Sequence, residues 1–246
     1  MLRPRYWRGW MQASSNEEEN MPLLGLVIVM DAIRVRDGIA VGLKRASLHT
    51  REAEIIQLLN SEPLVSHPDN ACIPLYEILN IPNDDEHHIL VMLFLHELES
   101  PPFETLGEVM EFCRQALYGL RFFHCHNIAH GDPHSGNIML DPTTIGRARA
   151  FTQTQCPSRY YWIDYNLAHM LEHPEKPGTL RIPYTRGGDR DIPETMEGKT
   201  HANPFASDIW WGLPNDAPFI VSATMVFTFT PCPSTSIAFP TGTPTN

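Results

Sequence analysis

The chain has 246 residues and a net charge of −11 at pH 7, and this length can bury the core of one two-lobed domain or of two small domains. The acidic balance argues against nucleic acid as a main partner. The strongest apolar run, residues 21–30, is too short to span a bilayer and follows acidic residues, so we expect a buried strand there, with no membrane segment and no signal peptide.

The first predicted elements are two strands and a helix. Residues 1–20 mix Arg and Trp with an acidic cluster and have no periodicity, which predicts a flexible leader. Two strand-like runs within residues 26–46 flank an Asp-Gly pair at positions 37 and 38, and this arrangement predicts a β-hairpin. The apolar spacing within residues 50–60 predicts a short amphipathic helix.

The following segment predicts another strand, a longer helix and two short strands. Residues 89–95 form an apolar strand, and Thr105 with Glu108 makes a capping box ahead of apolar residues at helical spacing. Two short strands are expected at residues 138–140 and 160–163. This order predicts an α+β protein with two lobes, the first small and rich in strands and the second mainly helical.

The most informative stretch is His-Gly-Asp-Pro-His-Ser-Gly-Asn at residues 130–137. Phosphoryl transfer requires a carboxylate near the acceptor hydroxyl and oxygen ligands for Mg²⁺. Asp132 suits the first task. Asn137 and Asp164, each placed beside a predicted strand, suit the second, because hard cations prefer oxygen ligands. The pattern therefore predicts a Mg²⁺-dependent phosphotransfer site.

This spacing resembles the catalytic loop and the metal-binding loop of the eukaryotic protein kinases. Val-Gly-Leu-Lys at residues 41–44 resembles the strand with the phosphate-contacting lysine, and Glu52 resembles the helix glutamate that pairs with this lysine. The resemblance implies ATP and Mg²⁺ as cofactors and an unknown protein as substrate. It implies these catalytic residues: Asp132, Lys44 and Glu52. The ATP-binding residues that it implies are Lys44, the gatekeeper Met92, the backbone of Leu93 and Leu95, and the metal ligands Asn137 and Asp164.

Three further strings extend the resemblance to roughly residues 26–212. His-Pro-Asp-Asn at 67–70 resembles the turn after the glutamate helix, and Ile-Pro-Glu at 192–194 resembles the A-P-E string. Asp208 resembles the aspartate that anchors the backbone of the catalytic loop. The string at residues 187–194 is similar to kinase-like proteins of mushroom-forming (basidiomycete) fungi. The implied organisation is an N-lobe at 21–95 and a partial C-lobe at 96–212, between the leader at 1–20 and a tail at 213–246.

The sequence departs from the family pattern at several positions. No G-x-G-x-x-G loop precedes Lys44, Gly131 stands in place of an arginine, and His134 stands in place of a lysine. A pseudokinase that serves as a binding or scaffold module is therefore the alternative to an active Ser/Thr-type protein kinase. The loop also resembles the H-G-D-x-H-x-G-N loop of aminoglycoside and choline kinases, although the strings at residues 192–194 and 208–210 argue against a small-molecule phosphotransferase.

The cysteines, the histidines and the tail have plainer interpretations. The five cysteines include no CxxC pair, which predicts reduced thiols and a cytoplasmic or nuclear location. The histidines around residues 124–134 fit no zinc pattern, and we expect His130 to be a packed core residue. The tail contains six Pro and seven Thr without Lys, Arg or Glu, which suggests an aberrant end rather than an evolved module.

Overall fold

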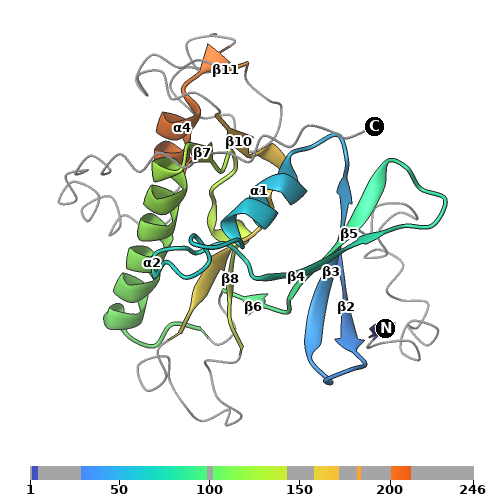
Figure 1. Ribbon diagram of the computed structural model, residues 1–246. Coiled ribbons are helices and arrows are strands. Elements are labelled where there is room, and N and C mark those ends of the chain that lie inside the picture. The colour runs from blue at the N-terminus through green and yellow to red at the C-terminus, as the bar shows by residue number, and fades with distance from the viewer. Residues whose placement is uncertain are drawn as a thin grey trace, which may run out of the picture.

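The computed structural model describes residues 2–4, 29–98, 102–142, 158–171, 182–183 and 201–211 (Figure 1). Within these ranges the architecture is α+β, with a five-stranded antiparallel sheet at the N-terminal side. In Figure 1 the sheet and the long helix α2 lie on opposite sides of the molecule, with α1 between them. The predicted fold class is confirmed in its small β-rich part, whereas the second part contains both helices and short strands.

The N-terminal sheet has the strand order β1-β2-β3-β5-β4. Its strands are β1 (Leu2–Pro4), β2 (Val29–Arg34), β3 (Ala40–Ser47), β4 (Leu75–Asn80) and β5 (His87–Leu93). The predicted hairpin joins β2 to β3. Gly38 has a φ of 74°, which only glycine adopts without strain. The Asp37 carboxylate accepts hydrogen bonds from Arg34 Nε at 2.9 and 3.0 Å.

Two expectations at the start of the chain are wrong. Residues 2–4, expected in a flexible leader, form β1 and pair with β2. Val29 and Met30, expected to be buried, are 60% and 48% exposed. The reason is the register of the edge strand, because β1 pairs with β2 only from Ala32 to Arg34 and leaves the start of β2 without a described neighbour on that side.

Helix α1 (Glu52–Leu59) buries its apolar face, which carries Ile55, Ile56 and Leu59. One of its C-terminal carbonyls is satisfied by the turn that follows, since the Asn70 side chain donates to Leu59 O at 2.7 Å. The same side chain donates to Leu64 O of the turn at 2.9 Å. The predicted turn at residues 67–70 thus stabilises the end of α1. The C-terminal end of the lobe's only described helix is tied to the following turn in this way.

Helix α2 (Leu106–Cys125) begins with the predicted capping box. Thr105 Oγ1 accepts from Glu108 N at 3.2 Å, and Glu108 Oε2 accepts from Thr105 N at 3.1 Å. The apolar spacing seen in the sequence corresponds to the buried side of this helix. The local signals for α2 are therefore confirmed.

Short elements complete the described part of the second lobe. Strands β6 (His96–Glu97), β8 (Ile138–Leu140) and β9 (Tyr160–Trp162) form one sheet, and β7 (Ile128–Ala129) pairs with β10 (His169–Met170). A further pair is β11 (Ile182–Pro183) with β12 (His201–Ala202). The remaining elements are the 3-10 turns η2 (Ser135–Asn137) and η3 (Tyr165–Leu167) and helix α4 (Pro204–Trp211).

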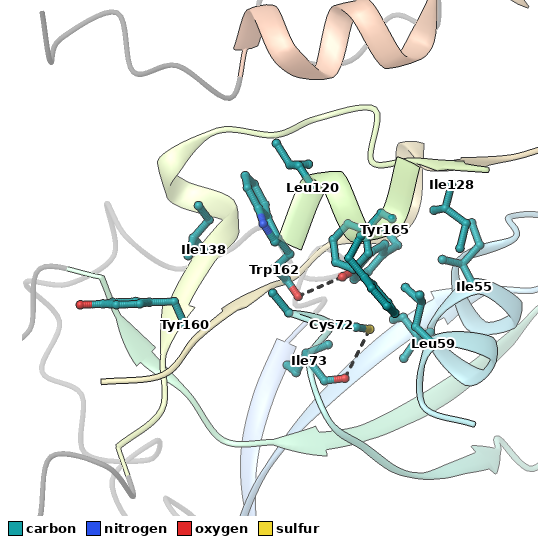
Figure 2. Packing of buried hydrophobic residues seen from close by; sticks show 14 of the residues in the cluster. Ile55, Leu59, Cys72, Ile73, Leu120, Ile128, Ile138, Tyr160, Trp162 and Tyr165 are labelled. Atoms are coloured by element: carbon teal, nitrogen blue, oxygen red, sulfur yellow. Dashed lines mark hydrogen bonds between the residues drawn. The ribbon is translucent and has the colours of Figure 1, made fainter. Parts of the chain in front are cut away.

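The main core lies where α1, α2 and β9 meet (Figure 2). Trp162 is almost fully buried, and its indole Nε1 donates to Ala116 O of α2 at 3.1 Å. A Cβ at Gly119 would lie 2.6 Å from the Ala71 Cβ and 3.1 Å from the Trp162 ring, so glycine is needed where α2 approaches β9. This packing fixes the strand that leads to Asp164.

The described residues contain no helix that is long and apolar enough to cross a membrane. Cys72 and Cys113 are free and buried, whereas Cys125 is disulfide-bonded. The expectation of reduced thiols is thus wrong for Cys125, because disulfide formation depends on proximity in space rather than on spacing in sequence. The predicted tail at 213–246 and the string at 192–194 also lie outside the described residues.

Candidate functional site

A cluster of three charged side chains, of which Lys44 and Glu52 are buried and Asp164 is partly exposed, joins β3, α1 and the segment after β9. Lys44 Nζ lies 2.5 Å from Glu52 Oε1 and 2.8 Å from Asp164 Oδ1. Lys44 and Glu52 are only 8% and 2% exposed. The structure therefore brings together three predicted site residues, one of which is 120 positions from the lysine.

The charges of this cluster do not cancel, because one ammonium faces two carboxylates. Burial raises the pKa of Glu52, and the charge of Lys44 opposes that shift. Burial also raises the pKa of Asp164, but the charge and the hydrogen bond of Lys44 outweigh it and leave that pKa below its usual value. With both carboxylates ionised the cluster carries a net charge of −1, which favours binding of a further cation.

Asp164 has a left-handed backbone conformation, with φ 60° and ψ 72°. A non-glycine residue pays about 1–2 kcal/mol for this conformation, and such residues concentrate at functional sites. The following residue, Tyr165, is fully buried and donates its N–H to Glu52 Oε1 at 3.2 Å. Tyr165 packs against the rings of Phe123 and His130 at centroid distances of 5.8 and 5.0 Å. This packing holds the Asp164 carboxylate toward Lys44.

The loop with Asp132 is closed by Asn137. The Asn137 amide nitrogen donates to Asp132 O at 2.8 Å and to Asp132 Oδ2 at 3.1 Å. The amide oxygen of Asn137 is then the atom able to ligate a cation. Strands β8 and β9 pair directly, and Ile163 N donates to Asn137 O at 2.9 Å, so the ladder places Asn137 beside the segment that carries Asp164.

Asp208 of α4 anchors the beginning of the same loop. Its fully buried carboxylate accepts from His130 N at 2.7 Å, from Gly131 N at 2.8 Å and from His124 Nε2 at 2.8 Å. The two backbone contacts are those that the kinase resemblance implies for Asp208. Sequence reasoning missed the role of His124, although a polar side chain on the last turn of an amphipathic helix is a signal for such a contact.

Gly131 is required by the backbone of this loop. It has a φ of 82°, and a Cβ there would lie 2.0 Å from Leu167 O. The arginine that the kinase pattern places at this position cannot be accommodated without moving the chain. The departure seen in the sequence therefore reflects close packing between the catalytic loop and η3.

His130 is fully buried, as expected for a packed core residue. Its ring lies 5.1 Å from the ring of Trp162, and its Nε2 donates to Ile163 O at 3.0 Å. Burial lowers the pKa of His130 and keeps the imidazole neutral near pH 7. This residue contributes packing to the loop rather than a titrating group.

The predicted adenine-binding residues lie at the end of β5. Met92 and Leu95 are buried in the main core, and Met92 is opposite Gly42 in the β3–β5 register, two residues from the partner of Lys44. The Leu93 N–H donates to Pro74 O at 3.0 Å, so this N–H already has a partner in the structure. The structure thus places this segment next to the strand that carries Lys44.

Comparison with known proteins bears on the fold. No protein-family model matches the chain, and no sequence of a curated protein matches it. The solved structure of the kinase PK-1 of Cydia pomonella granulovirus matches with a TM-score of 0.50 at 16% identity, over 75% of this chain and 60% of that chain. This chain has a protein-kinase-like fold.

In this protein-kinase-like fold, β1–β5 and α1 form the small lobe, and it supplies Lys44 and Glu52. The described part of the other lobe supplies Asp132, Asn137 and Asp164. The chain spans about 60% of the length of the viral kinase. At 16% identity this likeness establishes the architecture and leaves activity to be argued from the residues.

Proposed function

We propose that the chain is an ATP- and Mg²⁺-dependent protein kinase that transfers a phosphoryl group to a protein hydroxyl. The observation that carries the proposal is the convergence of Lys44, Glu52 and Asp164 in one ion cluster, next to the loop that holds Asp132 and Asn137. Positioning and charge stabilisation are the main contributions that a protein makes to phosphoryl transfer. These residues provide both.

Each residue has a proposed role that follows from its charge and from the atoms with which it can bind a ligand. Lys44, positioned by Glu52, contacts the phosphates, and Met92 with the backbone of Leu93 and Leu95 holds the base. Asp164 and the Asn137 amide oxygen fit Mg²⁺ because both are oxygen ligands and the cluster is short of one positive charge. When bound, this ion neutralises phosphate charge. Asp132 accepts the proton of the acceptor hydroxyl.

A pseudokinase that binds nucleotide without turnover is the second candidate. The observation in its favour is the sequence before Lys44, which has no glycine-rich loop to cover the phosphates. The charged cluster alone supports binding, whereas turnover also requires the phosphates to be held in line with Asp132. A small-molecule phosphotransferase is the third and least favoured candidate.

The proposal is tested by measuring Mg-ATP binding and phosphotransfer separately. We expect Mg-ATP to raise the Tm of the wild-type chain, and we expect Asp164→Asn to lose most of that shift because a metal ligand is removed. Asp132→Asn should keep the shift and lose transfer to generic protein substrates. Asp85→Asn, an exposed aspartate in the small lobe, is the matched control.

Each outcome separates the candidates. An unchanged Mg-ATP shift in Asp164→Asn would contradict the metal assignment, and equal transfer by Asp132→Asn would place the base elsewhere. A nucleotide shift without transfer to any protein would favour the pseudokinase. Transfer to aminoglycosides or choline but not to proteins would favour the small-molecule enzyme.

The finer resemblance and the location of the protein are also proposals. The similarity to kinase-like proteins of mushroom-forming fungi rests on the string at residues 187–194 alone, since no family model and no curated sequence matches the chain. A cytoplasmic or nuclear location stays a prediction from the sequence, and the disulfide at Cys125 does not support it.

A further inference from the structure

The side chain of His134 lies beside the proposed base. Its Nε2 is 3.5 Å from Asp132 Oδ2, and its Nδ1 accepts a hydrogen bond from Gly136 N at 3.1 Å. A backbone N–H can only donate, so Nδ1 must be the accepting nitrogen and the neutral ring carries its proton on Nε2. The N–H group of the imidazole therefore faces the Asp132 carboxylate.

Gly136 makes room for this ring. A Cβ at Gly136 would lie 2.8 Å from His134 Cε1 and 3.0 Å from His134 Nδ1. Gly136 is not among the glycines with positive φ, so its backbone does not itself require glycine. The absence of a side chain at Gly136 is thus explained by the position of the His134 ring over η2.

Two donors converge on one oxygen of Asp132. The Asn137 amide nitrogen donates to Oδ2 at 3.1 Å, and His134 Nε2 approaches the same atom at 3.5 Å. The second distance is longer than a hydrogen bond, but catalytic contacts in ligand-free chains often tighten only in the complex. With Oδ2 held from two sides, Oδ1 is the oxygen that can face an acceptor hydroxyl.

We propose that His134 is a positioning residue for phosphoryl transfer, which orients the Asp132 carboxylate so that Oδ1 receives the proton of the acceptor hydroxyl. This inference rests on the proposed function. His134 acts through Asp132 and does not itself exchange a proton with the substrate. The position that holds a lysine in the kinase pattern therefore has a defined role here with a different side chain.

The first test separates the two contacts of the ring. In His134→Asn the short amide side chain can still accept from Gly136 N, as Asn does at helix N-caps, but it cannot reach Asp132. We expect kcat to fall about tenfold or more, with the KM for ATP and the Tm unchanged, because misplacement of a catalytic group is costly. His134→Gln, whose amide nitrogen extends about as far as Nε2, should recover much of the loss. The control is His49→Asn, at an exposed histidine in the turn between β3 and α1.

The second test is a double-mutant cycle between His134 and Gly136. Gly136→Ala should displace the ring and lower kcat in the wild-type background, and it should cost nothing more in the His134→Asn background. Equal effects of Gly136→Ala in both backgrounds would show that the glycine serves the backbone alone and would overturn the argument.

The failure of this inference is distinguishable from the failure of the proposed function. If the wild-type chain transfers phosphate and His134→Asn transfers it with the same kcat, only the role of His134 is overturned. If the wild-type chain binds Mg-ATP and transfers phosphate to no acceptor, the proposed function fails, and the positioning role fails with it.

Discussion

The candidate site has a loop side, formed by residues 130–137, and a lysine side, formed by Lys44, Glu52 and Asp164. The two sides are held by different interactions. On the loop side, Asp208 and Asn137 direct their side chains at backbone groups of the loop. On the lysine side, Lys44 of β3 forms ion pairs with Glu52 of α1 and with Asp164 after β9. Hydrogen bonds to the backbone therefore dominate the first side, and ion pairs dominate the second.

This difference predicts different behaviour. Buried hydrogen bonds to the backbone fix a loop geometry whether or not a ligand is present, and the loss of one leaves an unsatisfied group. A cluster with one positive and two negative charges changes when a cation or a phosphate enters, because the new charges compete for the same partners. We infer that the loop at residues 130–137 is preformed, whereas the Lys44 cluster would rearrange if Mg-ATP binds there as proposed.

The largest effect is expected at Asp208. Asp208→Ala leaves the donors of His130 and Gly131 without an acceptor inside the protein, together with that of His124, and should lower the free energy of unfolding by about 3–5 kcal/mol. Chemical denaturation measures this, with the exposed Asp85→Ala as the control. Surface substitutions typically change the free energy of unfolding by about 0.5 kcal/mol. A loss below about 1 kcal/mol would therefore mean that α4 does not anchor the loop.

Gly131→Arg should be the next most damaging change, although it restores the family pattern. A side chain at this position needs a left-handed backbone and overlaps Leu167 O, so we expect a loss of about 2–4 kcal/mol in unfolding free energy. The unfolding midpoint in urea checks this. A stable Gly131→Arg chain with higher transfer activity would show that the loop adapts easily and would break the distinction between the two sides.

Lys44→Met should reverse the pKa shift of Asp164. Burial raises this pKa and Lys44 lowers it below the ordinary value of 3.8, so removal of the lysine leaves burial opposed only by the hydrogen bond from the Asn166 N–H and by His130. In the wild type, the Asp164 contribution to stability is present above pH 3.8 and is lost as the pH falls through the lowered pKa. In Lys44→Met the ionised carboxylate should destabilise the fold as the pH rises. Carboxyl ¹³C NMR titration measures the shift, and Arg45→Met, on the same strand, should leave it unchanged.

The smallest effect is expected at Gly42, which lies two residues before Lys44 in β3. A Cβ at Gly42 would meet only Leu93 O, at an ordinary 3.7 Å. Because glycine in a strand costs about 0.5–1 kcal/mol relative to alanine, Gly42→Ala should gain about 0.5 kcal/mol in unfolding free energy. Thermal unfolding followed by circular dichroism tests this. A clear loss would mean that the strand beside Lys44 is as tightly constrained as the loop at Gly131.

Features encoded by neighbouring residues were predictable from the sequence. The capping box of Thr105 and Glu108 and the hairpin at Gly38 are confirmed, because each depends on side chains within a few positions. The candidate site residues were chosen from their spacing and from a family pattern, and the structure brings Lys44, Glu52 and Asp164 together. Their chemical roles stay predictions until transfer and binding are measured.

The sequence alone determined which residue types are available for phosphotransfer and where the hairpin at Gly38, α1, α2, β8 and β9 lie, since periodicity, caps and turns are local. Only the tertiary structure decided that Gly131 is required by Leu167, that His124 shares Asp208 with the loop backbone, and that the His134 ring faces Asp132. It also decided the pairing of Leu2–Pro4 with β2 and the exposure of Val29. These features depend on contacts between segments far apart in the chain, and no spacing within one segment specifies such contacts.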